Sequence, residues 1–335
     1  MDHRLSRGAC KPENGQEFSV DGATYVLAGK LGDGAAGLVR RAVRKQDGVE
    51  LAIKFLAPDP KYIDESVFDD VAARFQREGQ RGTRLRHYAL VAVRAYSENV
   101  GGEAFAKGGP CNPFILMEIV KGGTLEDLIR REGAPHADRR GPKVFALTPE
   151  RLSIAVHVAE ALRYLHQKKL VHRDVKPANI FLPSGAKGSL PSAKLGDFGI
   201  MKWGDFQASV SSGTLTVTSQ QGLGTLKYMS PEQAIAPKDV TVRSDIYSLG
   251  ITLFELFTGQ ILPSPHHVFE ILGARLSRGT TTSRYLAMGY HISIGDTGIA
   301  ELILDMHLRG PSGRPPIDKV AGRLTHELER RIGEQ

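Results

Sequence analysis

The chain has 335 residues, and its 44 Lys and Arg residues against 37 Asp and Glu residues give a net charge of +7. This length is sufficient for one large domain or two smaller ones. Hydrophobic residues make up 41% and charged residues 24%, which excludes wholesale disorder. The two cysteines, Cys10 and Cys111, exclude a disulfide scaffold and match no zinc-binding spacing.

The first third of the chain has a strand-rich pattern. Residues 1–23 are polar, are expected to form a loose lead-in, and lack the apolar segment of a signal peptide. Glycine turns and the pair Asp47-Gly48 separate short aliphatic runs, which predicts an antiparallel meander. Strands are predicted at 24–31, 37–45, 49–56, 89–96 and 113–120. A helix is predicted over 68–85, where apolar residues recur at helical spacing.

After Gly122-Gly123 the pattern becomes helical. Thr148 is a predicted N-cap, followed by Pro149 at the first helical position, and Gly259 is a predicted helix stop. Helices are predicted at 126–131, from 149 onward, and at 242–258, 269–276, 299–308 and 317–332, and a basic polar insertion at 136–143. The change near residue 120 predicts two parts, 24–120 and 121–335.

Two short patterns in the strand-rich part point to phosphate binding. Gly32, Gly34 and Gly37 form G-x-G-x-x-G, and a strand rather than a helix follows, so the glycines would let a hairpin backbone approach phosphates closely. Lys54 lies inside an apolar run, where burying its amine without an anionic partner is costly. Glu78, on the predicted helix 68–85, is the candidate partner.

The string HRDVKPAN (172–179) and the triplet DFG (197–199) supply the groups that metal-dependent phosphoryl transfer needs. Asn179 and Asp197 offer oxygen ligands for magnesium. Asp174 can orient a hydroxyl nucleophile, and Lys176 can neutralise charge on the group transferred.

With these motifs in this order, the chain resembles eukaryotic-type (Hanks-type) serine/threonine protein kinases over roughly residues 24–320. The segments that carry the resemblance are GDGAAGLV (32–39), LAIK (51–54), Glu78, LMEIVKGGTL (116–125), HRDVKPAN, DFG, GTLKYMSPEQ (224–233), SDIYSLG (244–250) and Arg314. SPEQA in place of APE favours a bacterial member. The resemblance implies a bilobal α+β fold, with a five-stranded antiparallel sheet and one helix in the N-lobe and a mostly helical C-lobe.

The resemblance also implies residue roles, with ATP and Mg²⁺ as cofactors and Mn²⁺ as the alternative metal. The implied catalytic residues are Lys54, Glu78, Asp174, Lys176 and Thr225, and the implied metal ligands are Asn179 and Asp197. The implied nucleotide contacts are Gly32, Asp33, Gly34, Gly37, Val39, Ala52, Lys54, Met117, Glu118 and Val120. Asp245 would anchor the catalytic loop, and Arg314 would pair with Glu232. Lys176 and Thr225 favour serine/threonine over tyrosine specificity.

Regulation and partners follow from the same resemblance. Arg173 would meet a phosphate on the activation segment, Asp197–Glu232, and we expect autophosphorylation within Thr214–Thr218. The expected partners are ATP, protein substrates and a second copy of the chain, with a role in signalling. No nucleic acid and no membrane span are expected, since no apolar run approaches the roughly 20 residues of a span, and the default location is cytoplasmic.

Three alternatives stay open. A scaffolding pseudokinase is disfavoured by the complete catalytic set, and a small-molecule kinase of the aminoglycoside-phosphotransferase type by the long segment that ends in SPEQ. A nucleic-acid-binding protein is suggested by charge alone. The departures from the family pattern are Ala36, Met201 and Leu226 and insertions around 98–112, 133–147 and 183–193, which we expect only to connect elements.

Overall fold

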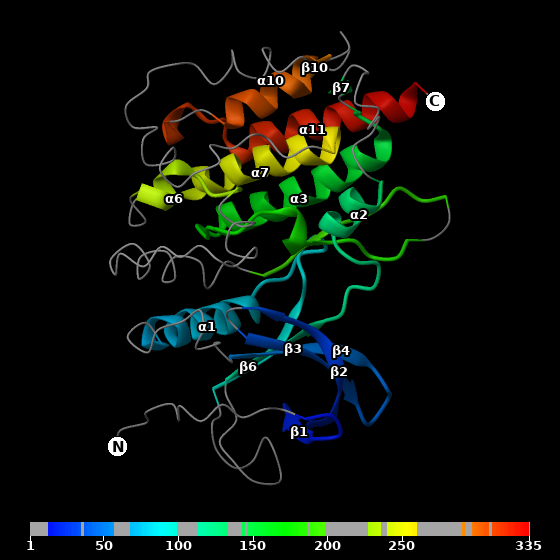
Figure 1. Ribbon diagram of the computed structural model, residues 1–335, viewed down its shortest axis with the longest axis vertical. Helices are drawn as coiled ribbons and strands as arrows, with labels where there is room; N and C mark the ends of the chain where they lie inside the picture. The colour runs from blue at the N-terminus through cyan, green and yellow to red at the C-terminus, as the bar shows by residue number, and fades with distance from the viewer. Residues whose placement is uncertain are drawn as a thin grey trace. The chain divides into compact units, whose positions relative to one another are not determined.

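The computed structural model describes residues 13–34, 37–56, 68–98, 113–132, 143–144, 146–185, 188–197, 227–235, 240–259, 290–291, 297–307 and 310–334 (Figure 1). The chain divides into two compact units. The first holds the described residues up to His87 and Val91–Ile119. The second holds Tyr88–Leu90 and the described residues from Val120 onward. Among these residues, no helix is long and apolar enough to cross a membrane.

In the described part of the first unit, six antiparallel strands form one sheet in the order β1-β2-β3-β4-β6-β5. They are β1 (Glu17–Val20), β2 (Ala23–Gly34), β3 (Gly37–Arg44), β4 (Glu50–Leu56), β5 (Val93–Ser97) and β6 (Phe114–Glu118). The prediction of five strands is wrong by one, because β1 lies inside the supposed lead-in. Its four residues, EFSV, do alternate polar and apolar, but they form the shortest run that can indicate a strand and lie within a polar stretch.

Aromatic packing on one face of the sheet holds β1 in place. Phe18 of β1 is buried, stacks on Tyr25 with ring centroids 5.3 Å apart, and meets the edge of Phe114 at 5.5 Å. Along β4, Leu51, Ile53 and Phe55 belong to this same core cluster. Since side chains alternate along a strand, Ala52 and Lys54 lie on the opposite face.

Helix α1 (Phe68–Gly82) packs against β5 at very short range. A Cβ added at Gly79 would lie 2.1 Å from Cδ2 of Tyr96, and one added at Gly82 would lie 2.7 Å from Cγ2 of Val93. Two glycines one turn apart thus let the helix backbone approach the strand. The helix ends at Gly82 rather than at the predicted residue 85.

The second unit is built from helices and short strand pairs. Its helices are α2 (Leu125–Glu132), α3 (Pro149–Gln167), α6 (Pro231–Ile235), α7 (Val242–Thr258), α10 (Thr297–Met306) and α11 (Ile317–Gly333), with 3-10 turns η2 (Pro177–Asn179) and η5 (Pro311–Gly313). Strands β8 (Ile180–Phe181) and β9 (Lys194–Leu195) pair antiparallel, and β7 (Lys143–Val144) and β10 (Tyr290–His291) pair parallel. The predicted helix 269–276 lies outside the described residues.

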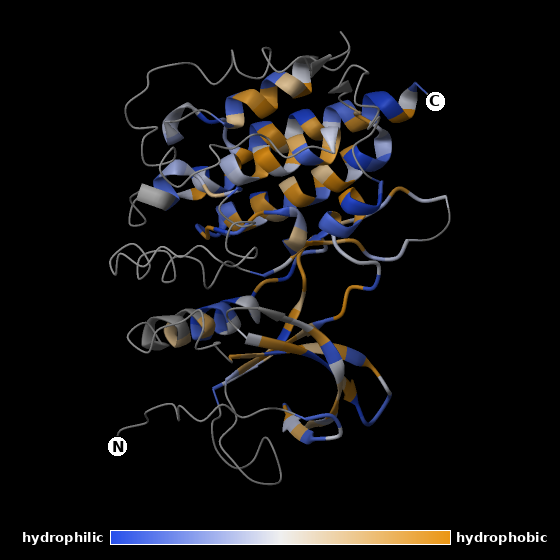
Figure 2. Ribbon diagram, viewed as in Figure 1, coloured by the Kyte–Doolittle hydropathy of each residue, from blue (hydrophilic) through white to orange (hydrophobic). Residues whose placement is uncertain are grey.

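Helix α7 is the buried centre of this unit, and α3 and α10 pack against it (Figure 1). Figure 2 shows apolar residues along α3, α7 and α10. The predicted caps are confirmed: the Thr148 side chain accepts from the Arg151 N–H, and Gly259 adopts φ +66° and bonds to the Glu255 carbonyl. The predicted start and end of α7 agree with the structure. Lys143, assigned to a polar insertion, instead begins a strand.

The contact of Gly79 with Tyr96 yields a stability prediction. We expect Gly79→Ala to lower the free energy of unfolding by about 1–3 kcal/mol, because the new methyl group overpacks against a ring held between helix and strand. Gly322→Ala is the matched control, since a Cβ there meets nothing within 4 Å inside α11. It should raise the free energy by about 0.5–1 kcal/mol. Urea denaturation of both variants would measure this, and equal effects would contradict the packing account.

Candidate active site

In the first unit, Lys54 of β4 and Glu78 of α1 form a buried ion pair. Their Nζ and Oε1 atoms are 3.5 Å apart, and the side chains are 10% and 4% exposed. The pairing expected from the cost of burying a lysine amine is therefore present. A buried ammonium held this way is positioned to meet a further anion such as a phosphate.

Strand register places several of the expected nucleotide contacts together. Val39 lies opposite Lys54, and Met117 lies opposite Ala52. Residues directly opposite in an antiparallel pair share a face, so all four lie on the face away from the aromatic core. The Glu118 N–H is bonded to the Ala92 carbonyl at 2.9 Å, so its own carbonyl is the backbone atom that could meet a base. Val120 lies in the second unit.

The glycine-rich segment is a β-hairpin, as expected. Gly32 pairs with Val39, Asp33 with Leu38 and Gly34 with Gly37, so β2 and β3 continue to the turn. The turn residues 35 and 36 lie outside the described residues. The same G-x-G-x-x-G spacing also occurs in dinucleotide-binding folds, but there a helix follows the glycines, whereas here a strand follows.

In the second unit, the carboxylate of Asp245 near the start of α7 anchors the loop that carries HRDVKPAN. Oδ1 accepts the N–H of Arg173 at 2.8 Å, and Oδ2 accepts the N–H of His172 at 2.8 Å. Oδ2 is also 2.8 Å from Nε2 of His166 at the end of α3. Asp245 is 1% exposed, so these bonds form away from water.

Arg173 takes a strained backbone conformation between two hydrogen bonds. Its φ is +68°, a left-handed value that costs a non-glycine residue roughly 1–2 kcal/mol. Its N–H is held by Asp245, and its carbonyl accepts from Nε2 of Gln233 at 2.9 Å. This bond joins the SPEQ segment to the loop. The Arg173 side chain is exposed.

Asp174, Lys176 and Asn179 form one buried polar cluster. Nδ2 of Asn179 donates to Oδ2 of Asp174 at 2.6 Å and to its carbonyl at 2.8 Å. The Lys176 ammonium lies 3.4 Å from the same Oδ2, with 15% of its side chain exposed. The contacts orient the Asp174 carboxylate and keep the positive charge of Lys176 beside it.

The donors of this cluster suit a hard metal ion. Because the Asn179 amide nitrogen serves Asp174, its Oδ1 is the atom that could bind a metal. The Asn179 carbonyl accepts the N–H of Gly196, which directly precedes Asp197. An amide oxygen and a carboxylate, completed by phosphate oxygens and water, form a typical magnesium site. Asp197 has φ +57°, a second strained residue at the site.

His172 supports the loop from inside and stays neutral. Its Nδ1 accepts the N–H of Asp174 at 3.3 Å, so Nε2 carries the proton and donates to the Gly196 carbonyl at 3.1 Å. Burial lowers the pKa of His172 below its ordinary value. The neutral ring therefore links the backbone of Gly196, the residue before Asp197, to the backbone of Asp174.

The Glu232–Arg314 pair expected from the sequence is present and bidentate. NH1 lies 2.5 Å from Oε1, NH2 lies 2.9 Å from Oε2, and Ser244 Oγ donates to Oε1 at 2.7 Å. Burial acts to raise the pKa of Glu232, but the bonds from Arg314 and Ser244 outweigh it, and the pKa lies below its ordinary value. Glu232 of the SPEQ segment is therefore held in place as an ionised carboxylate.

Sequence reasoning missed two residues that hold this region. Gln233 bonds to Arg173 from 60 positions away. Tyr228 donates to Oε2 of Glu255 at 2.5 Å, and burial raises the pKa of both groups. The SPEQ segment was recognised, but no spacing in the sequence indicates the partners of these side chains.

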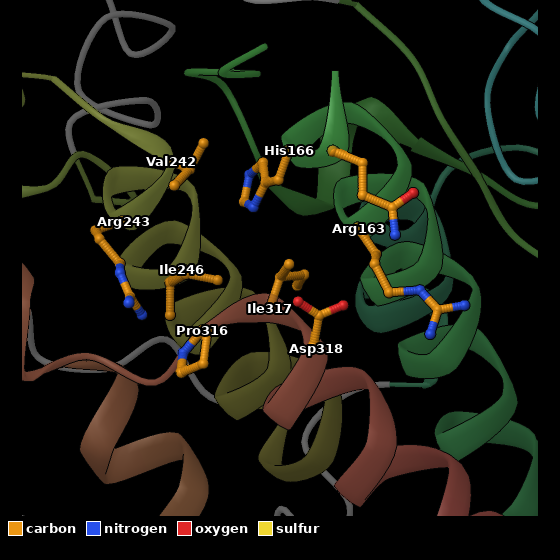
Figure 3. Close-up of a pocket in the computed structure, with 9 residues that line it drawn as sticks. Arg163, His166, Val242, Arg243, Ile246, Pro316, Ile317 and Asp318 are labelled. Carbon is orange, nitrogen blue, oxygen red and sulfur yellow. The ribbon is translucent and has the colours of Figure 1, made fainter. Parts of the chain in front are cut away.

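A pocket of about 220 Å³ lies beside the Asp245 anchor (Figure 3). His166 lines it, along with apolar residues of α7 and the start of α11, such as Ile246 and Ile317. Arg163 and Asp318 stand at its polar side. His166 therefore lines this pocket and is also hydrogen-bonded through Nε2 to Asp245.

Several expectations lie outside the described residues. They are Thr225, Thr214–Thr218, Ala36, Met201, Leu226 and most of the insertions 98–112 and 133–147.

The described part of insertion 183–193 is hydrogen-bonded to other segments of the second unit. The Ser184 hydroxyl donates to the Lys121 carbonyl at 2.6 Å, and the Ser153 hydroxyl donates to the Pro191 carbonyl at 2.8 Å.

Comparisons with known proteins agree with this geometry. A family model described as "Protein kinase domain" matches residues 25–316. Serine/threonine-protein kinase PknB of Mycobacterium tuberculosis is 36% identical over 237 residues, 70% of this chain and 32% of that protein. A probable serine/threonine-protein kinase of Streptomyces coelicolor, SCO3848, is 35% identical over 246 residues, 71% of this chain and 30% of that protein. The chain thus spans about a third of the length of these relatives.

A solved structure shows that the fold is shared. The crystal structure of the Mycobacterium tuberculosis PknI kinase domain, a C20A_R136A double mutant, aligns with a TM-score of 0.59 at 24% identity. The alignment covers 91% of this chain and 95% of that one.

The Asp245 anchor yields a prediction for the loop. We expect Asp245→Asn to lower the free energy of unfolding by about 2–4 kcal/mol, because an amide nitrogen replaces an acceptor and leaves a buried N–H unbonded. Asp305→Asn, exposed near the end of α10, is the control and should change stability by less than about 0.5 kcal/mol. Thermal denaturation would measure the stability of both variants. A stability of Asp245→Asn equal to that of the wild type would contradict the anchoring role.

Proposed function

We propose that this chain, which belongs to the protein kinase family, transfers the γ-phosphate of ATP to serine and threonine hydroxyls of proteins. The observation that carries the proposal is the cluster of Asp174, Lys176 and Asn179 on a loop anchored by Asp245. The serine/threonine kinases among the relatives support the choice of acceptor. The proposal assigns the catalytic domain to residues 24–320, with an N-lobe over 24–120 and a C-lobe over 121–335.

The chemistry uses the oriented carboxylate of Asp174. It accepts the proton of the substrate hydroxyl as that oxygen bonds to the γ-phosphorus and the bond to the β–γ bridging oxygen breaks, with ADP as leaving group. Lys176 neutralises charge that develops on the transferred group. Mg²⁺ or Mn²⁺ at Asn179 and Asp197 would supply charge neutralisation on the phosphate oxygens.

The first unit supplies the nucleotide contacts in this proposal, apart from Val120 of the second unit. Lys54, held by Glu78, would bind the α- and β-phosphates, and the hairpin with Gly32, Asp33, Gly34 and Gly37 would cover them. Val39, Ala52 and Met117, on the same sheet face as Lys54, would contact the base, with the backbone of Glu118 and Val120. Catalysis then comes mainly from positioning and charge complementarity.

The proposed base can be tested by transfer of labelled γ-phosphate to a generic protein acceptor. We expect Asp174→Asn to lower turnover roughly 10²- to 10⁴-fold while ATP still binds, because the carboxylate acts on the reacting hydroxyl. Asp305→Asn should keep wild-type turnover. Transfer by Asp174→Asn at the wild-type rate would refute the role of Asp174. A wild-type chain that binds ATP and transfers nothing would contradict the proposed activity and favour a scaffolding role.

We also propose that the chain phosphorylates itself within Thr214–Thr218, in a signalling role. The support is the exposed side chain of Arg173, on a loop residue tied through Gln233 to the SPEQ segment. Incubation with ATP and Mg²⁺ should add phosphate to intact wild-type protein and none to Asp174→Asn. Peptide mapping should place the added phosphate in this stretch, with Thr225 unmodified as a proposed catalytic residue. Activity on another protein with no added mass would overturn self-phosphorylation alone.

A further inference from the structure

We propose that Glu98 is a positioning residue that holds α1, and with it Glu78, in place for Lys54. This inference rests on the proposed function. Sequence reasoning assigned Glu98 only to the start of a connecting insertion. The structure places it directly after β5, beside the helix that carries Glu78.

The contact consists of two hydrogen bonds to one carboxylate oxygen. Nε2 of Gln76 lies 2.6 Å from Oε1 of Glu98, and Nε2 of Gln80 lies 2.8 Å from the same atom. The two glutamines are one helical turn apart, so they stand on the same side of α1. Hydrogen bonds to an ionised acceptor are stronger than those between neutral groups.

These bonds complement the glycine contacts of α1. Gly79 and Gly82 set how closely the helix approaches β5, through Tyr96 and Val93. Only the side of α1 that carries these glycines fits this closely against Tyr96 and Val93, so the contacts already favour one rotation of the helix. The two glutamines, bonded to Glu98 just after β5, hold that rotation from a second side of the helix.

Rotation matters because Glu78 lies between the two glutamines in sequence. At about 100° per residue, Glu78 points roughly 200° away from Gln76 and from Gln80, toward the opposite side of the helix. A turn of α1 that broke the bonds to Glu98 would therefore carry the Glu78 carboxylate away from the Lys54 ammonium. The bonds to Glu98 and the Lys54–Glu78 ion pair therefore form in the same orientation of α1.

Glu98 is exposed, in contrast to the ion pair that it would support. Its bonds compete with water, so their loss should change the global stability little. The expected effect is a shift of α1 among orientations, which lowers the fraction of molecules with the Lys54–Glu78 pair formed.

The test compares Glu98→Ala with Glu98→Gln in the full chain. Glu98→Ala should lower the turnover of labelled phosphate transfer roughly 3- to 10-fold. Glu98→Gln keeps an acceptor oxygen and should recover most of that loss. Glu329→Ala, an exposed glutamate on α11, is the matched control and should leave turnover unchanged. Equal turnover of Glu98→Ala and wild type would overturn the proposal.

Two further readouts separate positioning from a general loss of stability. Hydrogen exchange of the α1 amides should rise in Glu98→Ala while that of α3 stays at the wild-type rate, and equal rises in both would overturn the proposal. In a Glu78→Gln background, Glu98→Ala should change residual turnover less than 2-fold, since its effect passes through Glu78. An undiminished effect there would also overturn it.

Failure of the proposed function has a different signature. A wild-type chain without phosphate transfer contradicts the proposed activity, whereas the exchange experiment still measures whether Glu98 holds α1. An active wild type with unchanged α1 exchange in Glu98→Ala overturns the positioning role alone.

Discussion

The buried carboxylate of Asp245 is the constraint on which the polar cluster of the second unit depends. A carboxylate with 1% exposure is stable only when hydrogen bonds replace the water it has lost, and the backbone of His172 and Arg173 supplies them. Its third neighbour, His166, fixes the end of α3 to the start of α7. The left-handed backbone of Arg173 follows from these bonds, and Asp174 is the next residue along. The orientation of the proposed base is therefore set in the core of the unit.

From this anchor, a chain of polar contacts runs to both sides. The neutral ring of His172 bonds to the carbonyl of Gly196 and so fixes the residue before Asp197. On the other side, Gln233 holds the Arg173 carbonyl, and the neighbouring Glu232 is locked by Arg314. All of these groups are bonded, and His172, Gln233 and Arg314 are buried, which makes the arrangement specific as well as stable.

In the first unit, a charged side chain is held in place by the packing of a helix rather than by a buried hydrogen-bonded anchor. A buried ion pair gains little net stability, because the loss of hydration offsets most of the attraction. Lys54 and Glu78 are held together because α1 is docked on β5 by the close approach at Gly79 and Gly82. The unit thus keeps a lysine charge buried on the sheet face that also carries Val39, Ala52 and Met117.

The sequence by itself determined the features that rest on neighbouring residues. Aliphatic runs between glycine turns predicted most strands, an N-cap at Thr148 predicted the start of α3, and a glycine stop at Gly259 predicted the end of α7. The cost of burying an amine predicted the partner of Lys54. The family resemblance added the pair of Glu232 and Arg314. Only the tertiary structure decided the packing of β1, through Phe18, against Phe114. It also decided the bond from Gln233 to Arg173 and the contact of Glu98 with α1. These contacts join residues that are distant in sequence, and a single contact of that kind imposes no period or spacing on the sequence.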